Sequence, residues 1–459
     1  MSELKKTLYL AGGALVLALL AIATAPRPTT PDAFADRGEP FFPEFEDPNS
    51  AATLEVVEFD EETGSAQAFK VANDGGRWTI PSHHDYPADG EDRLARTAAG
   101  VLGIHKDDFR SDNVSDHEAL RVVDPLDEGV SVLKGRGKRV TLRDRGGAIL
   151  ADFIVGGQPE GRAGFRFVRI PGQKRVYAVR MDVDISTRFG DWIEKDLLKL
   201  ARADIEKVVV RDYSIDERTG RLDQRDVVTL TKDEEGEWQT DRMRSSQEVD
   251  SSKMNPLLTA LDDLNIVGVR PKPPGLSASL TRAPGARLTQ ADVRSLQSRG
   301  YYFTYDGQLV SNDGELQVES KSGVLYTLRF GEVVYGTGEA VTAGAEAVEP
   351  EGEAGGARGP GENRYLFITA DFEPKALPEP PKPSDTAFEQ KAESEWTDGD
   401  RRNKELLDAH EEWKKKTEEG REQAGELNAR FAGWYYVISA ADFEKMRVTR
   451  RDLVKAKSS

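Results

Sequence analysis

The sequence has no cysteine, and this absence excludes several kinds of site at once. Without a thiol there can be no disulfide framework, no thiolate metal ligand, no cysteine nucleophile and no lipid anchor on cysteine. Basic residues are also in deficit, with 63 Lys and Arg against 81 Asp and Glu and a formal net charge of −18. A strongly acidic chain is repelled by nucleic acid and by anionic lipid headgroups. We therefore expect no nucleic-acid partner.

Long apolar stretches are scarce as well, and the exception lies near the N-terminus. Lys5 and Lys6 precede an uncharged run at residues 7–25 (TLYLAGGALVLALLAIATA). About 19 apolar residues are just long enough for a helix to span a bilayer core of roughly 30 Å. Lysines mark the cytoplasmic side of such a helix, so the run predicts a single-pass anchor with the bulk of the chain extracytoplasmic.

A cleaved signal peptide is the alternative interpretation of the same run. Small residues at Ala23 and Ala25 suit a cleavage site. The run is longer than the usual apolar region of a signal peptide, and Pro26 would follow the cut directly. Both features favour an anchor that is retained.

Composition and periodicity along the remaining chain predict an α+β protein. Its N-terminal transmembrane helix is followed by repeated modules of antiparallel strands plus an amphipathic helix. The predicted parts are an anchor at 1–25, a proline- and acid-rich tether at 26–51, a first α+β module at 52–125, a second at 126–270, a β-rich third module at 285–373, a proline linker with a charged helix at 374–430, and a C-terminal strand and helix at 431–459.

Two stretches of the chain share one pattern, which predicts an internal repeat over residues 52–104 and 205–264. Each has a strand, a turn, a hairpin containing Gly-x-Trp, and an amphipathic helix. Pro256 in the second copy is expected at the first helical position, with Asn255 as the cap. The predicted helix faces are Leu94, Ala98, Val101 and Leu102 in the first copy, and Met254, Leu257, Leu258, Leu261 and Leu264 in the second.

Other segments carry local signals. Residues 187–200 are expected to form a helix, and Thr289 to Asp292 resembles a capping box. Residues 336–363, rich in Gly, Ala and Glu, are expected to be a disordered insertion. A charged helix is expected from about Ser384 to Arg430, and Ser439 is expected to cap a last helix. The expected apolar anchors are Phe189, Trp192, Ile193, Leu197 and Leu200 for the first helix, and Phe388, Trp396, Leu406, Leu407 and Trp413 for the charged one.

No group of residues in the sequence has the pattern of a catalytic or metal-binding site. His83 and His84 are adjacent, so on extended chain they point to opposite faces and rarely share a metal ion; with His105 and His117 they are expected to be exposed loop residues. Residues 135–138 (GRGK) lack the rest of a phosphate-binding fingerprint and indicate a hairpin turn. The pairs Ser252-Lys253 and Lys321-Ser322 have no supporting groups, and Trp78, Trp192 and Trp238 are expected in the core. We predict no catalytic, cofactor-binding or metal-binding residues, and no enzyme.

Residues 130–267 resemble the bacterial family catalogued as domain of unknown function 4340. The resemblance is carried by FRFVRIPGQKRVYAVR at 165–180, TRFGDWIEKDLL at 187–198, IEKVVV at 205–210, the Gly-Glu-Trp hairpin and the leucine-rich helix after it. It implies an N-terminal segment in the bacterial inner membrane, an α+β body outside the cytoplasm, and association with ABC-type export systems. No catalytic residues are implied.

Taken with the resemblance, these features predict a non-catalytic accessory or scaffold subunit whose partner is a membrane protein, with an ABC-type permease as the candidate. Two other functions stay open. One is an envelope hydrolase for glycan or peptide that uses carboxylates and the His83–His84 loop. The other is a periplasmic ligand-binding module with its pocket between the repeats. Oligomeric state is not predicted.

Overall fold

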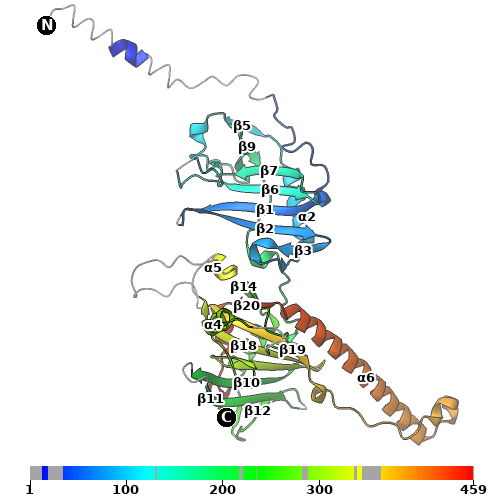
Figure 1. The fold of residues 1–459 in the computed structure, drawn as a ribbon. Coiled ribbons are helices and arrows are strands. Elements are labelled where there is room, and N and C mark those ends of the chain that lie inside the picture. The colour runs from blue at the N-terminus through cyan, green and yellow to red at the C-terminus, as the bar shows by residue number, and fades with distance from the viewer. Residues whose placement is uncertain are drawn as a thin grey trace, which may run out of the picture. The chain divides into compact units, whose positions relative to one another are not determined.

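A computed structural model describes residues 13–18, 35–61, 63–129, 132–216, 221–233, 235–281, 288–334, 339–343 and 363–457. The protein is α+β, with two large antiparallel sheets and few helices (Figure 1), as the sequence predicted. The chain divides into two units: Met1–Lys70 with Glu91–Ile185, and Val71–Gly90 with Ser186–Ser459. Both predicted modules, 52–125 and 126–270, therefore contribute residues to each unit.

The predicted anchor lies mostly outside the described residues. Residues 13–18 are helical, and their apolar side chains are exposed. Within the described ranges, no helix combines the length and the apolar character that crossing a membrane requires.

The predicted tether is partly folded. Residues 26–34 lie outside the described residues, but Phe41 and Phe45 are each only 3% exposed in the first unit. The Phe41 amide donates to the carbonyl of Ile104 at 2.9 Å, and the Tyr177 hydroxyl donates to the Asp36 carboxylate. Residues 36–50 are therefore packed chain, not the extended tether that their proline and acid content suggested.

The first sheet has nine strands in the order β4-β3-β2-β1-β6-β7-β8-β9-β5. Leu54 and Val56 of β1, with Leu142 of β6 and Phe153 of β7, are completely buried in its core. Helix α2 (Glu91–Leu102) follows β4 and buries Leu94, Ala98 and Val101, the face that its spacing predicted. The strands are β1 (Ala51–Asp60), β2 (Ser65–Asp74), β3 (Arg77–Ile80), β4 (Tyr86–Pro87), β5 (Asp108–Ser111), β6 (Lys138–Asp144), β7 (Ile149–Val155), β8 (Phe165–Arg169) and β9 (Val176–Arg180).

The second sheet has eight strands in the order β12-β11-β10-β17-β18-β19-β20-β14. Helix α3 (Ser251–Asp262) begins earlier than predicted: Asp250 is its N-cap, and Pro256 lies inside the helix, so the prediction of Asn255 as cap is wrong. The strands are β10 (Ile205–Asp216), β11 (Arg221–Lys232), β12 (Trp238–Thr240), β14 (Ile266–Pro271), β17 (Glu315–Ser320), β18 (Val324–Val334), β19 (Asn363–Phe372) and β20 (Trp434–Ile438).

The two sheets share one strand order. If β4 is left out and the other strands of the first sheet are numbered 1 to 8 in chain order, their order across the sheet is 3-2-1-5-6-7-8-4. The eight strands of the second sheet, numbered 1 to 8 in the same way from β10 to β20 without β13, β15 and β16, have the same order. Helix α2 in the first sheet and helix α3 in the second each lie between the third and the fourth of these strands in the chain. The recurring sequence pattern at 52–104 and 205–264 falls on equivalent elements.

The second unit carries additions to this plan. Helix α4 (Gln290–Gln297) opens with the predicted capping box at Thr289 and Asp292. Two small ladders pair β15 (Tyr301–Phe303) with β16 (Leu309–Ser311), and β13 (Gln247–Val249) with β21 (Val454–Ala456). After β20 come α7 (Ala440–Met446), capped by Ser439 as predicted, and α8 (Arg450–Leu453). Of the predicted insertion 336–363, residues 339–343 contain the short helix α5 (Glu339–Thr342), Asn363 begins β19, and the others lie outside the described residues.

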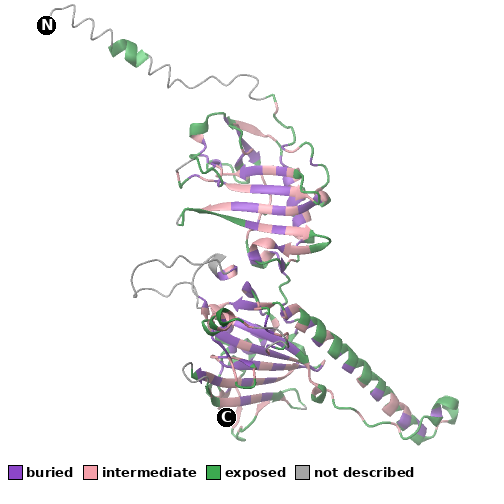
Figure 2. Ribbon diagram, viewed as in Figure 1, coloured by how far each residue is buried: buried purple, intermediate pink, exposed green. Residues whose placement is uncertain are grey.

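A long arm joins β19 to β20. Its helix α6 (Asp398–Phe431) has 34 residues, starts after a capping box at Thr397 and is exposed along its outer face (Figure 2). The predicted start near Ser384 is wrong, because residues 377–397 form a strap along the first half of the helix. Strap contacts include Trp413 Nε1 donating to the Leu377 carbonyl at 2.8 Å and Lys391 Nζ at 2.9 Å from Asp400.

The predicted helix at 187–200 is also wrong. Only a short 3-10 turn, Phe189–Asp191, forms there. The segment is held instead by local side-chain bonds, with Ser186 Oγ donating to Asp191 at 2.6 Å and Trp192 Nε1 donating to the Ser186 carbonyl at 3.0 Å. Such bonds compete with helical backbone pairing. All five predicted anchors, Phe189, Trp192, Ile193, Leu197 and Leu200, are nevertheless buried.

Candidate functional site

The four histidines singled out in the sequence, His83, His84, His105 and His117, do not come together as a metal site in the structure. His83 and His117 are buried, at 4% and 7% exposure, so the prediction of exposed loop residues is wrong for these two. His84 and His105 are exposed as expected. Within the described residues, no group of three or more His, Asp or Glu side chains is arranged to hold a metal ion.

The His83–His84 turn belongs to the second unit and contacts one short segment there. His83 Nε2 hydrogen-bonds Thr342 Oγ1 at 3.0 Å, and His84 Nε2 donates to the Ala343 carbonyl at 2.6 Å. Both histidines reach the same segment because the chain is not extended at this point: His84 has a left-handed φ of 59°. The His83 ring also stacks on Phe189, with centroids 4.7 Å apart.

Burial sets the ionisation of this cluster. Burial of the His83 ring, together with the charges of His84 and Arg270, lowers its pKa to about 4. Arg270 is itself buried, which lowers its pKa, and its Nη2 donates to the Val341 carbonyl at 3.0 Å. His83 is therefore neutral near pH 7 and serves as a packing and hydrogen-bonding residue.

Residues 135–138 are not the expected hairpin turn. Val123 pairs with Arg136 in an isolated parallel bridge, and β6 begins at Lys138. The Arg136 guanidinium donates to the carbonyls of Val132, Asp124, Pro125 and Asp127. A Cβ on Gly137 would lie 2.8 Å from the Arg121 carbonyl oxygen. These glycines thus allow close backbone packing, and Arg136 organises the loop before them.

The other residues singled out in the sequence have structural surroundings. Trp192 is completely buried as predicted, whereas Trp78 and Trp238 are only half-buried. Ser252 lies in the first turn of α3, where its amide donates to Asp250. Ser322 Oγ donates to Gln423 of α6 at 2.8 Å.

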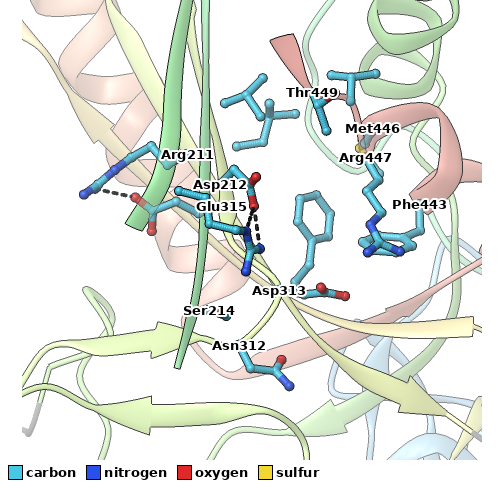
Figure 3. Close-up of a pocket in the computed structure, with 15 residues that line it drawn as sticks. Arg211, Asp212, Ser214, Asn312, Asp313, Glu315, Phe443, Met446, Arg447 and Thr449 are labelled. Carbon is cyan, nitrogen blue, oxygen red and sulfur yellow. Dashed lines mark hydrogen bonds and ion pairs between the residues drawn. The ribbon is translucent and has the colours of Figure 1, made fainter. Parts of the chain in front are cut away.

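A cavity that the sequence did not suggest opens in the second unit. It has a volume of about 370 Å³ and lies between the sheet and the segment that follows α7 (Figure 3). In that view, Arg447 lies beside Phe443, and Asp212 and Glu315 lie across the cavity from them. The floor is apolar and buried, formed by Val210, Leu316, Phe330, Phe443, Met446 and Val448.

Carboxylates in the cavity wall are paired with arginines. Asp212 Oδ1 accepts from Arg225 Nε at 2.9 Å and from its Nη2 at 2.5 Å. Asp313 Oδ2 lies 2.8 Å from Nη1 of Arg364. The hydrogen bonds to Asp212 raise the pKa of Arg225 above its ordinary value.

Glu315 is the most deeply buried charge of the wall, with 5% exposure. Arg211 Nη1 donates to its Oε1 at 2.7 Å, and Arg329 Nε lies 3.2 Å from its Oε2. The Tyr213 hydroxyl donates to Oε2 at 3.3 Å. Burial, with the charge of Glu315, raises the pKa of Tyr213 to about 12. Two guanidinium groups on one carboxylate give the compensation that a buried charge requires.

No sequence signal could have revealed this cavity. One wall comes from strands near residue 212 and another from residues 443–449, more than two hundred positions later. Charged residues such as Asp212 and Arg225 resemble any exposed strand residue until the fold brings the two segments together.

The fold defines an α+β protein with two antiparallel sheets of equal strand order and a charged cavity in its second unit. Residues 78–279 match the family model described as Domain of unknown function (DUF4340). The match contains the stretch 130–267 and confirms the resemblance found there. The chain matches no curated protein. It also matches no solved structure.

The family match does not coincide with either sheet. It begins within β3, contains α2 and β5 to β9, and continues through β10 to β14. It therefore includes the second part of the first sheet and the first part of the second sheet.

Proposed function

We propose that this protein is a non-catalytic accessory or scaffold subunit of a membrane complex in the bacterial envelope, with an ABC-type transporter as its partner. The apolar run at 7–25, after Lys5 and Lys6, supports a single-pass anchor in the inner membrane with the body outside the cytoplasm. The family resemblance supports the choice of partner by analogy alone.

The observation that carries the scaffold role is the arm between β19 and β20. The equivalent connection in the first sheet, between β8 and β9, spans only residues 170–175. The second unit has in its place a strap and a 34-residue helix about 50 Å long. Insertions on a regular scaffold are frequent sites of interaction.

The arm has internal order that suits a rigid contact surface. Phe388 of the strap is 1% exposed and packs edge-to-face against Trp396, with ring centroids 5.6 Å apart. Asn403 of the helix accepts from the Ser384 amide at 3.1 Å, and Trp413 donates to Leu377. Residues 377 and 413 therefore lie in contact, so the distal part of the arm can be removed without separating the remaining ends.

Co-purification from gently solubilised membranes tests the proposal. The full chain should recover a transporter permease. A variant without residues 378–412, with its ends joined by a short Gly/Ser turn, should stay folded and membrane-bound but lose the partner. A protein that runs alone in every mild detergent, or an armless variant that still recovers the permease, would contradict the scaffold role.

The anchor has a separate test. A periplasmic reporter enzyme fused after residue 457 should be active, and mass spectrometry of the purified chain should find residues 7–25 still attached. Mature protein in the cytosol would refute the anchor. A chain that begins near residue 26 would instead identify the run as a cleaved signal peptide.

A further inference from the structure

The cavity of the second unit has the composition of a binding site, and its function is independent of the scaffold role. Its volume of about 370 Å³ lies within the range of small-molecule pockets, which is roughly 300–1,000 Å³. Phe330, Phe443 and Met446 supply a buried apolar floor, each with 4% exposure or less. Such a floor can hold an apolar chain or ring of a ligand.

Arginines and carboxylates line the cavity in equal number, but one arginine has no carboxylate partner among them. Arg211, Arg225 and Arg447 line it together with Asp212, Asp313 and Glu315. Arg364 and Arg329 lie directly behind and pair with Asp313 and Glu315. The arginines and the carboxylates that line the cavity are equal in number, but Arg329 and Arg364 also pair with two of these carboxylates, so Arg447 is left without a carboxylate partner among them.

Arg447 is the lining arginine that a ligand can reach. It follows α7 and is exposed, with its guanidinium 5.8 Å from the Phe443 ring centroid. In the described part of the chain, the carboxylates that line the cavity are paired with other arginines, and Arg447 forms no ion pair. A guanidinium placed over an aromatic floor can bind a carboxylate through two parallel hydrogen bonds.

We propose that the cavity binds a small amphipathic monocarboxylate, whose apolar part contacts Phe330, Phe443 and Met446 and whose carboxylate pairs with Arg447. A cationic ligand is disfavoured because the carboxylates of the wall are already paired with arginines and Arg447 would repel it. A polar ligand is disfavoured because it would leave its own groups unpaired against the apolar floor.

A matched series of water-soluble probes tests the inference on the full chain in lipid nanodiscs. The probes are 4-phenylbutyrate, 4-phenylbutylamine and 4-phenyl-1-butanol, which share the apolar part and differ in charge. Calorimetry or ligand-detected NMR should show saturable binding of the carboxylate, with a Kd on the order of 0.1–1 mM. The amine and the alcohol should bind about tenfold more weakly or not at all.

Variants locate the binding. Arg447→Gln should weaken the carboxylate about tenfold and bring it close to the alcohol. Arg451→Gln changes a neighbouring exposed arginine that does not line the cavity and should leave the affinity unchanged. Ser214→Phe, at a half-buried position on the wall, should block the probe while circular dichroism confirms the fold.

Several results would overturn the inference. They are no saturable binding of 4-phenylbutyrate to the wild-type chain, equal binding of the three probes, or unchanged affinity in Arg447→Gln. None of these results depends on the arm or on the partner, so the scaffold role would be unaffected by them.

Discussion

At the scale of single residues, His83 shows how strongly the fold decides what a side chain does. Its neighbours in the chain, Ser82 and His84, are polar and suggest a solvated loop. The fold instead places the imidazole between Phe189 and Thr342, two residues that are distant in the sequence. Because these contacts are long-range, sequence reasoning could identify the histidine pair but could not predict its burial.

The lowered pKa of His83 makes folding stability depend on pH in one direction. The folded pKa is about 4 and the ordinary value is 6.5, so the unfolded chain binds the proton more readily. The contribution of neutral His83 to the free energy of unfolding is therefore complete above pH 6.5, and it is lost as the pH falls toward 4. Between about pH 7.5 and pH 5, the free energy of unfolding measured with urea should fall by roughly 2 kcal/mol more in the wild-type chain than in His83→Gln.

Replacement of an exposed histidine provides the control for this prediction. His105 lies on the surface, and His105→Gln should keep the wild-type dependence on pH. Identical curves for the wild-type chain and His83→Gln would show that the imidazole is not buried in its neutral form.

Apolar residues were more predictable than polar ones. Leu94, Ala98 and Val101 were expected on one helix face and are buried on it. Phe189 and Trp192 were expected to be buried and are, although the helix proposed for them does not form. The spacing of apolar residues predicts which side chains are buried. The backbone conformation of residues 187–200 depends instead on local hydrogen bonds that involve Ser186 and Asp191.

At the scale of elements, α6 shows which helix features a sequence contains. Its capping box at Thr397 and its charged outer face are local signals. Its contacts with the sheet are not local. Gly420 lies so close to the turn after β17 that a Cβ there would be 2.1 Å from the Ser322 carbonyl oxygen. Gly425, five residues further on, has open space around the same position.

These two glycines make a matched pair for mutation. Alanine favours a helix by about 1 kcal/mol over glycine, so Gly425→Ala should stabilise α6 by up to that amount. Gly420→Ala gains the same propensity but forces the helix away from Ser322, with an expected net loss of roughly 1–3 kcal/mol. Hydrogen exchange of the α6 amides should slow in the first variant and accelerate in the second. Equal protection in both variants would mean that α6 does not pack closely against the sheet.

At the scale of the whole molecule, the α+β class followed from the sequence, but the extent of the common plan did not. Strand, hairpin and helix recur visibly at 52–104 and 205–264. The later strands β6 to β9 and β17 to β20 occupy equivalent positions without a shared motif, because different insertions separate them. Pairing between strands that are far apart in the chain produces no local sequence signal.

The strand order predicts how fragments of the chain behave. A fragment of residues 78–279, the span of the family match, lacks β1, the neighbour of β6, and also lacks β17 and β20, the neighbours of β10 and β14. Unpaired strand edges favour aggregation over folding. We expect this fragment to show no cooperative thermal transition by circular dichroism. Residues 35–457, which retain both sheets, should unfold cooperatively. A well-dispersed NMR spectrum for 78–279 would contradict the prediction.

If the proposed anchor is retained, the packing of Phe41 and Phe45 into the first unit limits how far that unit can lie from the bilayer. If the anchor ends at Ala25, only residues 26–35 are left to act as a leash before Asp36 is held by Tyr177. Ten residues reach at most about 35 Å when fully stretched. With such an anchor, residue 36 would lie within that distance of the lipid surface, and one protease cut within residues 26–35 would release the body into solution.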